Sequence, residues 1–231
     1  MKILITGGSL GIGLATAKEL HASGHELLLV ARNPDTLQVA KDTLGSRTET
    51  FAADLADSVQ ISGLLQYIEQ SNFFPNVLVL NAAAFCKNSR SVVTPSADEL
   101  RDLLEVNVIA NYQLVQGLLN YLKQSVYSRV VIIGSTASIR PDNGSLYGIS
   151  KWALRSYAYS LRSELRTLGI GVTLINPGGT FTERRVPSET VASDRLLEAS
   201  DIGKLINTLL TLSPQAVVEE INIRPMLGDT Y

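Results

Sequence analysis

The chain alternates between short apolar runs and longer segments in which apolar residues recur at helical spacing. Several runs, such as Leu27–Val30 and Val130–Ile133, are apolar without alternation, which is typical of strands covered on both faces. The runs predict strands at Lys2–Thr6, Glu26–Val30, Thr48–Ala52, Val77–Asn81, Arg129–Gly134, Val172–Asn176 and Glu219–Ile223. The amphipathic segments predict helices at Ile12–Ser23, Pro34–Leu44, Ser58–Gln70, Ser96–Ser125, Ser145–Thr167 and Ser200–Leu212.

Strands that alternate with helices predict βαβ units with right-handed crossovers. We expect one α/β domain over residues 1–231: a doubly wound (Rossmann) fold with a seven-stranded, mostly parallel sheet and helices on both faces. Pro34 suits a helix start, and Ser200-Asp201 predict an N-terminal cap for the last helix. Ligands of such a sheet bind beyond the carboxyl ends of its strands, so the candidates for function lie there.

Composition narrows the class of protein. The 231 residues are 45% hydrophobic and 18% charged, the balance of a one-domain globular chain. A net charge of −2 provides no attraction for nucleic acid or an anionic membrane, so we expect neither as a partner. No apolar stretch approaches the length of a membrane span, and Met1-Lys2 leads directly into a strand, which leaves no room for a secretion signal.

The reactive side chains indicate where in the cell the protein resides and whether it binds a metal. Cys86 is the only cysteine, so no internal disulfide can form, which fits a reducing compartment. We therefore expect a cytoplasmic protein. The sequence shows no cluster of His, Cys and Asp at ligand spacing, and we expect no metal site.

The first strand is followed by a glycine-rich turn that opens the first helix. It reads Thr6-Gly7-Gly8-Ser9-Leu10-Gly11-Ile12-Gly13. Glycines permit a tight turn and let the backbone approach a pyrophosphate, while the helix N-terminus supplies free N–H groups and partial positive charge. The turn predicts a dinucleotide site, and the alternative is a turn without a ligand. The residues expected to contact the dinucleotide here are Gly7, Ser9, Leu10, Gly11, Ile12 and Gly13.

The end of the second strand bears on which dinucleotide is bound. An NAD site would place an acidic side chain there, whereas this chain has Ala31-Arg32. The guanidinium of Arg32 suits a 2′-phosphate, so NADP(H) is preferred and NAD(H) remains an alternative. A solvated arginine is the other interpretation. Asp54, followed by Leu55 after the third strand, is placed to accept from an adenine amino group, although Asp is also an ordinary turn residue.

Four further residues carry candidate chemistry. Tyr147 and Lys151 lie four residues apart and so share a helix face; a lysine ammonium nearby lowers a tyrosine pKa from about 10, which makes the pair a candidate acid/base unit. Ser135, at the end of the fifth strand, is placed to hold a carbonyl oxygen. Asn107 lies inside a predicted helix, where a buried amide satisfied by nearby backbone is the alternative.

Taken together, these residues resemble the short-chain dehydrogenase/reductase family in its compact single-domain branch. The resemblance covers almost the whole chain. It rests on Thr6-Gly7-x-x-x-Gly11-x-Gly13, Leu80-Asn81-Ala82-Ala83, Asn107, Ser135, Tyr147-x-x-x-Lys151, and Pro177-Gly178 with Thr182.

The resemblance implies a role for each residue. Tyr147 would be the general acid/base and Ser135 would position the carbonyl. Lys151 would lower the tyrosine pKa and bind the nicotinamide ribose, and Asn107 would hold a water in a proton relay. Further cofactor contacts are implied at Asn81, Ala82, Ala83, Pro177, Gly178, Thr180 and Thr182. A homodimer or homotetramer, formed through the two long helices and the last strand, is also implied.

This chain departs from the family pattern at two places. The family usually has Asn-Asn-Ala-Gly after the fourth strand, and Leu80 and Ala83 replace its first and last residues. The methyl group of Ala83 would crowd the cofactor. Leu10 stands where many NADP-dependent members have Lys or Arg, so only Arg32 of the two usual phosphate-binding cations is present.

The sequence thus predicts an NADP(H)-dependent oxidoreductase that transfers hydride between nicotinamide and a carbonyl or secondary alcohol of a small molecule. The alternative is a catalytically silent dinucleotide-binding sensor or interaction protein, whose mark would be loss of Tyr147 or Lys151. An epimerase of the family's extended branch would need a further substrate domain. Residues 181–199 are expected to form a polar substrate loop or lid, which favours a small or polar substrate.

Overall fold

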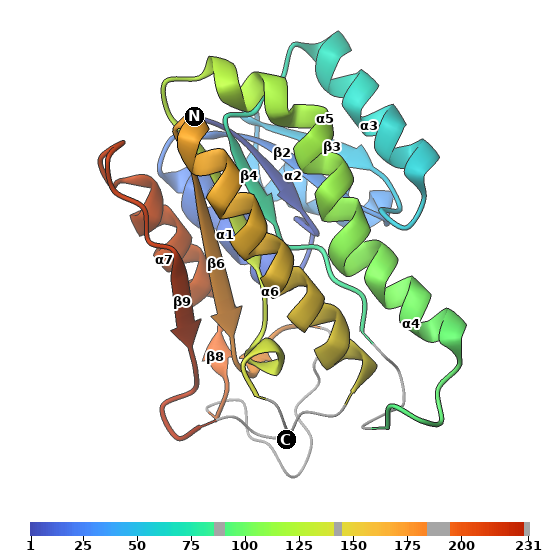
Figure 1. Cartoon of the computed structure of the whole chain (residues 1–231). Coiled ribbons are helices and arrows are strands. Elements are labelled where there is room, and N and C mark those ends of the chain that lie inside the picture. The colour runs from blue at the N-terminus through green and yellow to red at the C-terminus, as the bar shows by residue number, and fades with distance from the viewer. Residues whose placement is uncertain (86–90, 141–144, 184–194, 229–231) are drawn as a thin grey trace.

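A central sheet of seven parallel strands organises the molecule. The computed structural model describes residues 1–85, 91–140, 145–183 and 195–228 (Figure 1). The strand order is β3-β2-β1-β4-β5-β6-β9. These strands are β1 (Lys2–Thr6), β2 (Glu26–Ala31), β3 (Thr48–Ala52), β4 (Val77–Leu80), β5 (Ser128–Ile133), β6 (Ile170–Pro177) and β9 (Glu220–Ile223).

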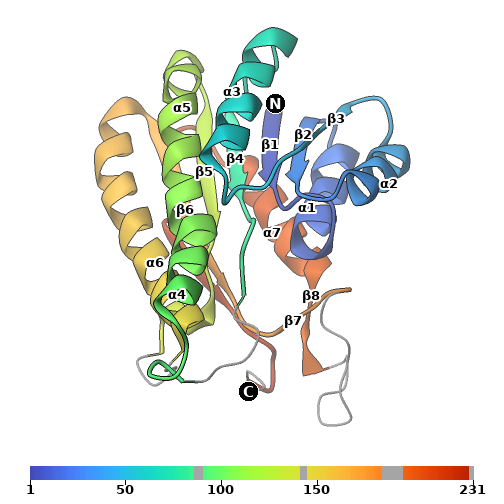
Figure 2. The same ribbon diagram turned by 90° about the vertical axis from the view of Figure 1, so that its right-hand side faces the viewer.

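Helices cover both faces of the sheet (Figure 2). The helices are α1 (Gly11–Ala22), α2 (Pro34–Leu44), α3 (Ser58–Ser71), α4 (Ala97–Leu104), α5 (Ala110–Gln124), α6 (Leu146–Leu165) and α7 (Ala199–Leu210). One core packs α1, α2 and α7 against Ile3 and Ile5, and a second core packs α3, α5 and α6 against Leu4. Because successive strand residues enter opposite cores, both must be apolar, which explains the uninterrupted apolar runs.

The predicted doubly wound fold is confirmed, and every strand pair of the seven-stranded sheet is parallel. The predicted element ends agree with the structure to within two residues. Two short strands, β7 (Thr180–Phe181) and β8 (Leu197–Glu198), form a separate parallel pair that the sequence pattern did not indicate. Among the described helices, none is long and apolar enough to cross a membrane.

Helix starts agree with the expectations in one case and differ in another. Pro34 lies in the first turn of α2, where Asn33 Oδ1 accepts from the N–H groups of Asp35 and Thr36. The predicted cap at Ser200-Asp201 is wrong, because α7 begins one residue earlier, at Ala199, and Glu198 at its N-cap makes no side-chain capping bond. The strand β8 leads directly into this helix and sets its start.

The long predicted helix Ser96–Ser125 contains a π-helical turn. A capping box formed by Ser96 and Glu99 starts α4, and the π-helical turn Glu105–Ile109 then connects α4 to α5. Asn107 lies in the middle of this turn and is fully buried. π-helical turns inside α-helices are frequent at functional sites.

The order of the strands reverses beside β1, which pairs with β2 on one side and with β4 on the other. The connections that follow β1 and β4 therefore run to opposite faces of the sheet. In such sheets, ligands bind in the crevice between these two connections. The glycine-rich turn follows β1, and Asn81 follows β4.

Candidate active site

The glycine-rich turn has a backbone that only glycine accommodates at three positions. Gly7 and Gly11 have φ angles of +64° and +55°, in the left-handed region that favours glycine. A Cβ on Gly13 would lie 2.1 Å from the carbonyl oxygen of Gly7. The turn therefore folds back closely on the start of α1.

Asn81 connects this turn to the end of β4 by hydrogen bonds. Its Nδ2 donates to the carbonyl oxygens of Thr6 and Gly7 at 2.9 and 3.3 Å. In return, the Thr6 hydroxyl accepts from the backbone N–H groups of Asn81 and Ala82 at 2.9 and 3.0 Å. The segment Asn81–Ala83 thus lies directly beside the turn.

Ser9 and Arg32 lie where the turn approaches α2. The Thr36 hydroxyl in the first turn of α2 donates to Ser9 Oγ at 3.0 Å, and the N–H of Gly8 donates to Val30 O at the end of β2. Arg32 is exposed and has no hydrogen-bond or ion-pair partner within the described part of the chain. This set of a hydroxyl, an uncommitted guanidinium and a helix N-terminus is chemically suited to a phosphate monoester.

Asp54 and Leu55 have ordinary structural roles in this structure. Asp54 Oδ1 accepts from the N–H of Ala56 at 3.0 Å, and Leu55 is buried in the core. The first is the geometry of a turn residue. Contact with an adenine remains a prediction for both residues.

Tyr147 lies in the first turn of α6, which the Ser145 hydroxyl caps by accepting from the N–H of Gly148 at 2.9 Å. The Tyr147 side chain is half-buried, and the exposed ring of Phe85 stacks on it with centroids 5.0 Å apart. Burial raises the pKa of Tyr147 to about 12, against the opposing effect of a hydrogen bond with Ser135. The structure therefore brings the predicted tyrosine and serine together.

Lys151 is buried one turn further along α6. Its side chain is 1% exposed, and Nζ donates to Ile133 O, at the end of β5, at 3.0 Å. Nζ lies 5.7 Å from the centroid of the Tyr147 ring. Burial lowers the pKa of Lys151 to about 7, so the amine is only partly charged at neutral pH.

The direction of the Tyr147 shift is opposite to the one expected from the sequence. We expected the Lys151 ammonium to lower the tyrosine pKa, but in the chain by itself burial dominates at both groups: it raises the pKa of Tyr147 and depresses that of Lys151. A spacing of four residues along a helix correctly indicated proximity. It could not indicate that the site is shielded from solvent, which disfavours both charged forms.

Both amide atoms of Asn107 are occupied. Oδ1 accepts from the N–H of Ala84 at 2.8 Å, while Nδ2 donates to Ala84 O at 3.1 Å and to Ser150 Oγ at 2.9 Å. The Ser150 hydroxyl donates in turn to Tyr147 O. Asn107 thus ties the segment after β4 to the first turn of α6. Sequence reasoning missed Ser150, whose only local signal is its place between Tyr147 and Lys151.

The segment after β6 passes over the glycine-rich turn. Gly178 N donates to Ile223 O, and the Thr180 hydroxyl donates to Gly178 O at 3.0 Å. A Cβ on Gly11 would lie 3.1 Å from Thr182 Cγ2. Pro177 ends β6 and begins the strap, residues 177–183, which brings Thr182 to the glycine-rich turn.

Glu183 is a residue of this strap that sequence reasoning did not select. Its Oε2 accepts from the N–H of Gly11 at 2.9 Å. Most of the predicted lid over 181–199 lies outside the described residues, since 184–194 are not described. At its ends, β7 pairs with β8. Within the described part of the chain, no group of three or more His, Cys, Asp or Glu residues is arranged to hold a metal ion.

A doubly wound sheet with a glycine-rich turn and a Ser-Tyr-Lys set at one edge defines a class of dinucleotide-dependent proteins. Comparison with known sequences agrees: a family model described as short chain dehydrogenase matches residues 1–191. The chain belongs to the short-chain dehydrogenase/reductase family of oxidoreductases.

Two relatives that match over nearly the full length have names that give only a reaction class. A protein of Staphylococcus epidermidis, named as an uncharacterized oxidoreductase, is 27% identical over 225 residues, which cover 96% of each chain. A Staphylococcus aureus protein of the same description is 27% identical over 226 residues, again 96% of each chain.

Solved structures show the same fold. A metagenomic short-chain oxidoreductase in complex with NADP has a TM-score of 0.84 and 27% identity, covering 97% of each chain. A short chain dehydrogenase from Burkholderia cenocepacia in complex with NADP has a TM-score of 0.85 and 27% identity, covering 96% of this chain and 95% of that one. A serine dehydrogenase complexed with NADP+ has a TM-score of 0.88 at 22% identity, covering 100% of this chain and 97% of that one. That third likeness is one of fold alone.

Proposed function

We propose that this protein is an NADP(H)-dependent oxidoreductase that transfers hydride between the nicotinamide and a carbonyl or secondary alcohol carbon of a small molecule. The observation that carries the proposal is that Ser135 and Tyr147 lie at one edge of the sheet, with Lys151 buried and its Nζ 5.7 Å from the centroid of the tyrosine ring. This set lies at the end of β5, on the sheet edge that also holds the glycine-rich turn.

The residues present fit a dinucleotide phosphate. The close backbone packing at Gly13 and the N-terminus of α1 would hold the pyrophosphate, and Asn81–Ala83 and Pro177–Thr182 flank that turn. Ser9 and the uncommitted Arg32 would hold a 2′-phosphate, which supports NADP(H) over NAD(H). Two solved family members of 27% identity bind NADP.

The bound cofactor would supply or accept the hydride. In the reducing direction, the Tyr147 hydroxyl would donate its proton to the oxygen of the substrate as negative charge develops there, and Ser135 would donate a hydrogen bond to the same oxygen. In the oxidising direction, Tyr147 would take the proton from the alcohol. Phe85, stacked on Tyr147, would form one wall of the substrate site and exclude water from the tyrosine.

A relay through Asn107 would have to use its backbone carbonyl. Both amide atoms of Asn107 are engaged, whereas its carbonyl oxygen accepts a hydrogen bond from Asn111 Nδ2 at 2.8 Å. A carbonyl oxygen has a second lone pair, which a water can use. The water would then pass the proton between Lys151 and solvent.

We further propose that the protein forms a homodimer or homotetramer. Exposed apolar side chains on α6 and on the adjoining π-helical turn and α5 support this proposal: Ile149, Trp152, Ile109 and Tyr112. Apolar residues grouped on neighbouring helices are typical of surfaces that a partner covers.

The proposal is tested by following NADPH oxidation against a panel of aldehydes, ketones and 3-oxoacyl thioesters. Wild type and Tyr147→Phe are compared, with NADH as the second cofactor. Turnover in wild type that is lost in the variant supports a tyrosine-dependent reductase. Turnover that survives the substitution contradicts the mechanism, and tight NADPH binding without any turnover favours the silent-sensor alternative.

A further inference from the structure

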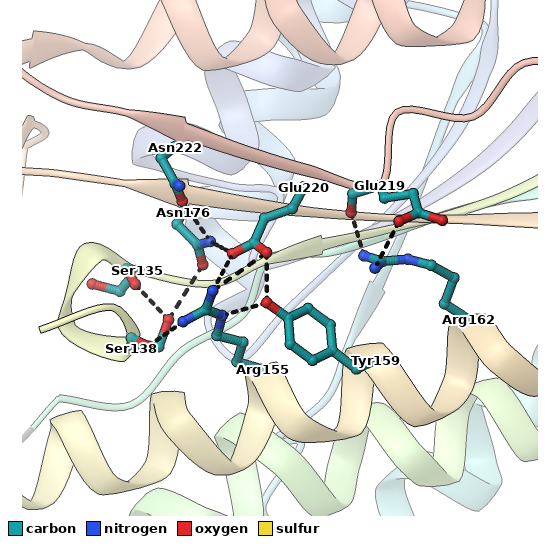
Figure 3. Close-up of polar contacts among 9 residues, drawn as sticks. All are labelled: Ser135, Ser138, Arg155, Tyr159, Arg162, Asn176, Glu219, Glu220 and Asn222. Atoms are coloured by element: carbon teal, nitrogen blue, oxygen red, sulfur yellow. Dashed lines mark hydrogen bonds and ion pairs between the residues drawn. The ribbon is translucent and has the colours of Figure 1, made fainter. Parts of the chain in front are cut away.

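A polar network joins the last strand of the sheet to the connection that carries Ser135 (Figure 3). Its members come from four parts of the chain that are far apart in sequence: Ser138 in the 3₁₀ turn after β5, Arg155 and Tyr159 on α6, Asn176 on β6, and Glu220 on β9. None of them belongs to the set that sequence reasoning selected.

Arg155 is the centre of the network. It follows Lys151 by one turn of α6, and its Nη1 donates to Ser138 O at 3.0 Å. Its Nη2 lies 3.1 Å from Glu220 Oε1, and its Nε donates to the Tyr159 hydroxyl, which donates to Glu220 Oε2 at 2.6 Å. The side chains of Arg155 and Glu220 are only 19% and 20% exposed, so solvent screens this ion pair much less than one on the surface.

Asn176 makes the second connection and is fully buried. Its Nδ2 donates to Glu220 Oε1 at 2.7 Å and to Asn222 Oδ1 at 2.9 Å, and its Oδ1 lies 3.4 Å from Ser138 Oγ. A Cβ on Gly134 would lie 2.2 Å from Asn176 Oδ1. The glycine that precedes Ser135 is therefore what lets this amide reach the end of β5.

Ser138 connects the network to Ser135. Both its hydroxyl and its N–H donate to Ser135 O, at 2.7 and 3.0 Å. The Ser135 hydroxyl accepts from the N–H of Ala137 at 3.1 Å, so the two ends of Ser135 are held by the same short turn. Whatever fixes Ser138 therefore restrains the backbone of Ser135, from which its side chain projects.

We propose that Glu220, Arg155 and Asn176 are positioning residues for the reaction, which hold Ser138 and thereby aim the Ser135 hydroxyl at Tyr147 and at the oxygen of the substrate. The inference rests on the proposed function and deepens it. It assigns to the last strand of the sheet a part in setting the geometry of the carbonyl site.

The charge of Glu220 is part of this arrangement. Burial opposes its ionisation, but the hydrogen bond from Tyr159 and the ion pair with Arg155 outweigh that effect and lower the pKa of Glu220. The carboxylate is therefore ionised at neutral pH. Its replacement by an amide removes the countercharge from Arg155 while it keeps the shape of the side chain.

The neighbouring residue provides a matched control. Glu219 pairs with Arg162 of α6, with its Oε2 3.5 Å from Arg162 Nη1, and Arg162 also donates to Val172 O and Glu219 O. This pair joins the same helix to the same edge of the sheet, as Figure 3 shows. Within the described residues, none of its hydrogen bonds leads to Ser138 or Ser135.

The test compares the kinetics of Glu220→Gln and Glu219→Gln in the full-length protein. We expect kcat of E220Q to fall by about tenfold or more, as small misplacements at a reacting centre do, with KM for NADPH within about twofold of wild type because the glycine-rich turn is untouched. The hydrogen bond with Ser135 lowers the pKa of Tyr147, so its loss should also move the pH profile of alcohol oxidation to higher pH. E219Q should retain both the kcat and the profile.

Substitutions of Arg155 test the same contacts from the other side. Arg155→Lys keeps the charge facing Glu220 and should recover part of the kcat that Arg155→Met loses. Should E220Q not fold, Tyr159→Phe removes one hydrogen bond to Glu220 and is measured in the same way, with a smaller fall in kcat expected.

Amide hydrogen exchange supplies a readout that does not depend on turnover. The N–H groups of Ala137, Ser138 and Ile139 are all bonded within the turn after β5, and they should exchange faster in E220Q but not in E219Q. Unchanged exchange, kcat and pH profile in E220Q, with an active wild type and an inactive Y147F, would overturn the inference alone. A wild type without turnover would instead count against the proposed function, and the exchange rates would still decide whether the network holds Ser135.

Discussion

The carboxylate of Glu183 accepts a hydrogen bond of 2.9 Å from the backbone N–H of Gly11, at the N-terminus of α1. The helix dipole and the free N–H groups make this position attractive to anions. The strap that follows β6 thus places a negative charge where the proposed pyrophosphate site also lies. Two anions compete for these donors, so a dinucleotide bound at the proposed site would displace Glu183 from Gly11.

Glu183→Gln should therefore bind NADP(H) more tightly than wild type. Loss of one like charge at a partly exposed position should lower the Kd by about threefold to tenfold, and by less at high salt. NADPH fluorescence titration at two ionic strengths measures the effect. Glu26→Gln, which removes an exposed charge at the amino end of β2, is the control, and an equal change in both variants would contradict the specific role of Glu183.

Arg32 should determine the preference between the two dinucleotides. Its guanidinium is exposed, lies beyond the end of β2 and is uncommitted within the described residues, and a hydrogen bond to a charged group is worth about 1.5–3 kcal/mol. Arg32→Ala should raise the Kd for NADPH by about 10-fold to 100-fold and leave that for NADH nearly unchanged. Arg47→Ala removes the same charge near His21, at the other end of the sheet. An equal loss of affinity for NADPH and NADH in R32A would show that Arg32 does not recognise the 2′-phosphate.

The parts of the molecule that the sequence predicted are those determined by local pattern. Strands such as β4 are buried on both faces and are apolar throughout, and the shared helix face of Tyr147 and Lys151 follows from helical spacing alone. The position of Ser135 at the end of a strand placed it at the ligand edge of the sheet. Each of these conclusions needs only a few neighbouring residues.

The parts that the sequence did not predict depend on contacts between distant segments. Gly11 and Glu183 are 172 positions apart, and Arg155 and Glu220 are 65 apart, so no periodicity connects them. The π-helical turn had a local signal, since Asn107 is a poor mid-helix residue. Its cause is nevertheless tertiary, because the amide that disfavours regular helix is bonded to Ala84 and Ser150.

Gly13→Ala should disable the dinucleotide site, whereas a matched substitution elsewhere should not. The new methyl group would lie 2.1 Å from Gly7 O, so the turn must shift, at a cost of about 1–3 kcal/mol of stability and with loss of NADPH binding. Gly63, inside α3, has only Phe51 Cζ near its missing Cβ, at 3.9 Å. Gly63→Ala should stabilise the protein by about 0.5–1 kcal/mol and leave binding intact. Thermal unfolding and NADPH titration of both variants check this contrast. Normal NADPH binding by G13A would contradict the proposal that the glycine-rich turn holds the pyrophosphate.

Lys151 should make the stability of the protein depend on pH in a defined window. Burial lowers its pKa from 10.5 to about 7, so between these values the unfolded chain holds a proton that the folded chain has lost. Raising the pH then favours folding. Relative to Lys151→Met, the free energy of unfolding of wild type should rise between pH 7 and pH 10 by up to about 1.4 kcal/mol per pH unit, and stay level below this window.

Urea unfolding of wild type and K151M at several pH values measures this difference. Lys41→Met, which removes an exposed ammonium from α2, controls for the loss of one lysine. A wild type that gains no stability over K151M as the pH rises would mean that Lys151 keeps its proton in the folded chain. The amine would then be a fixed cation beneath the Tyr147 ring, and it would favour the tyrosinate throughout the neutral range. A gain in the expected window would instead show that Lys151 exchanges protons near neutral pH, as a group in a proton relay must.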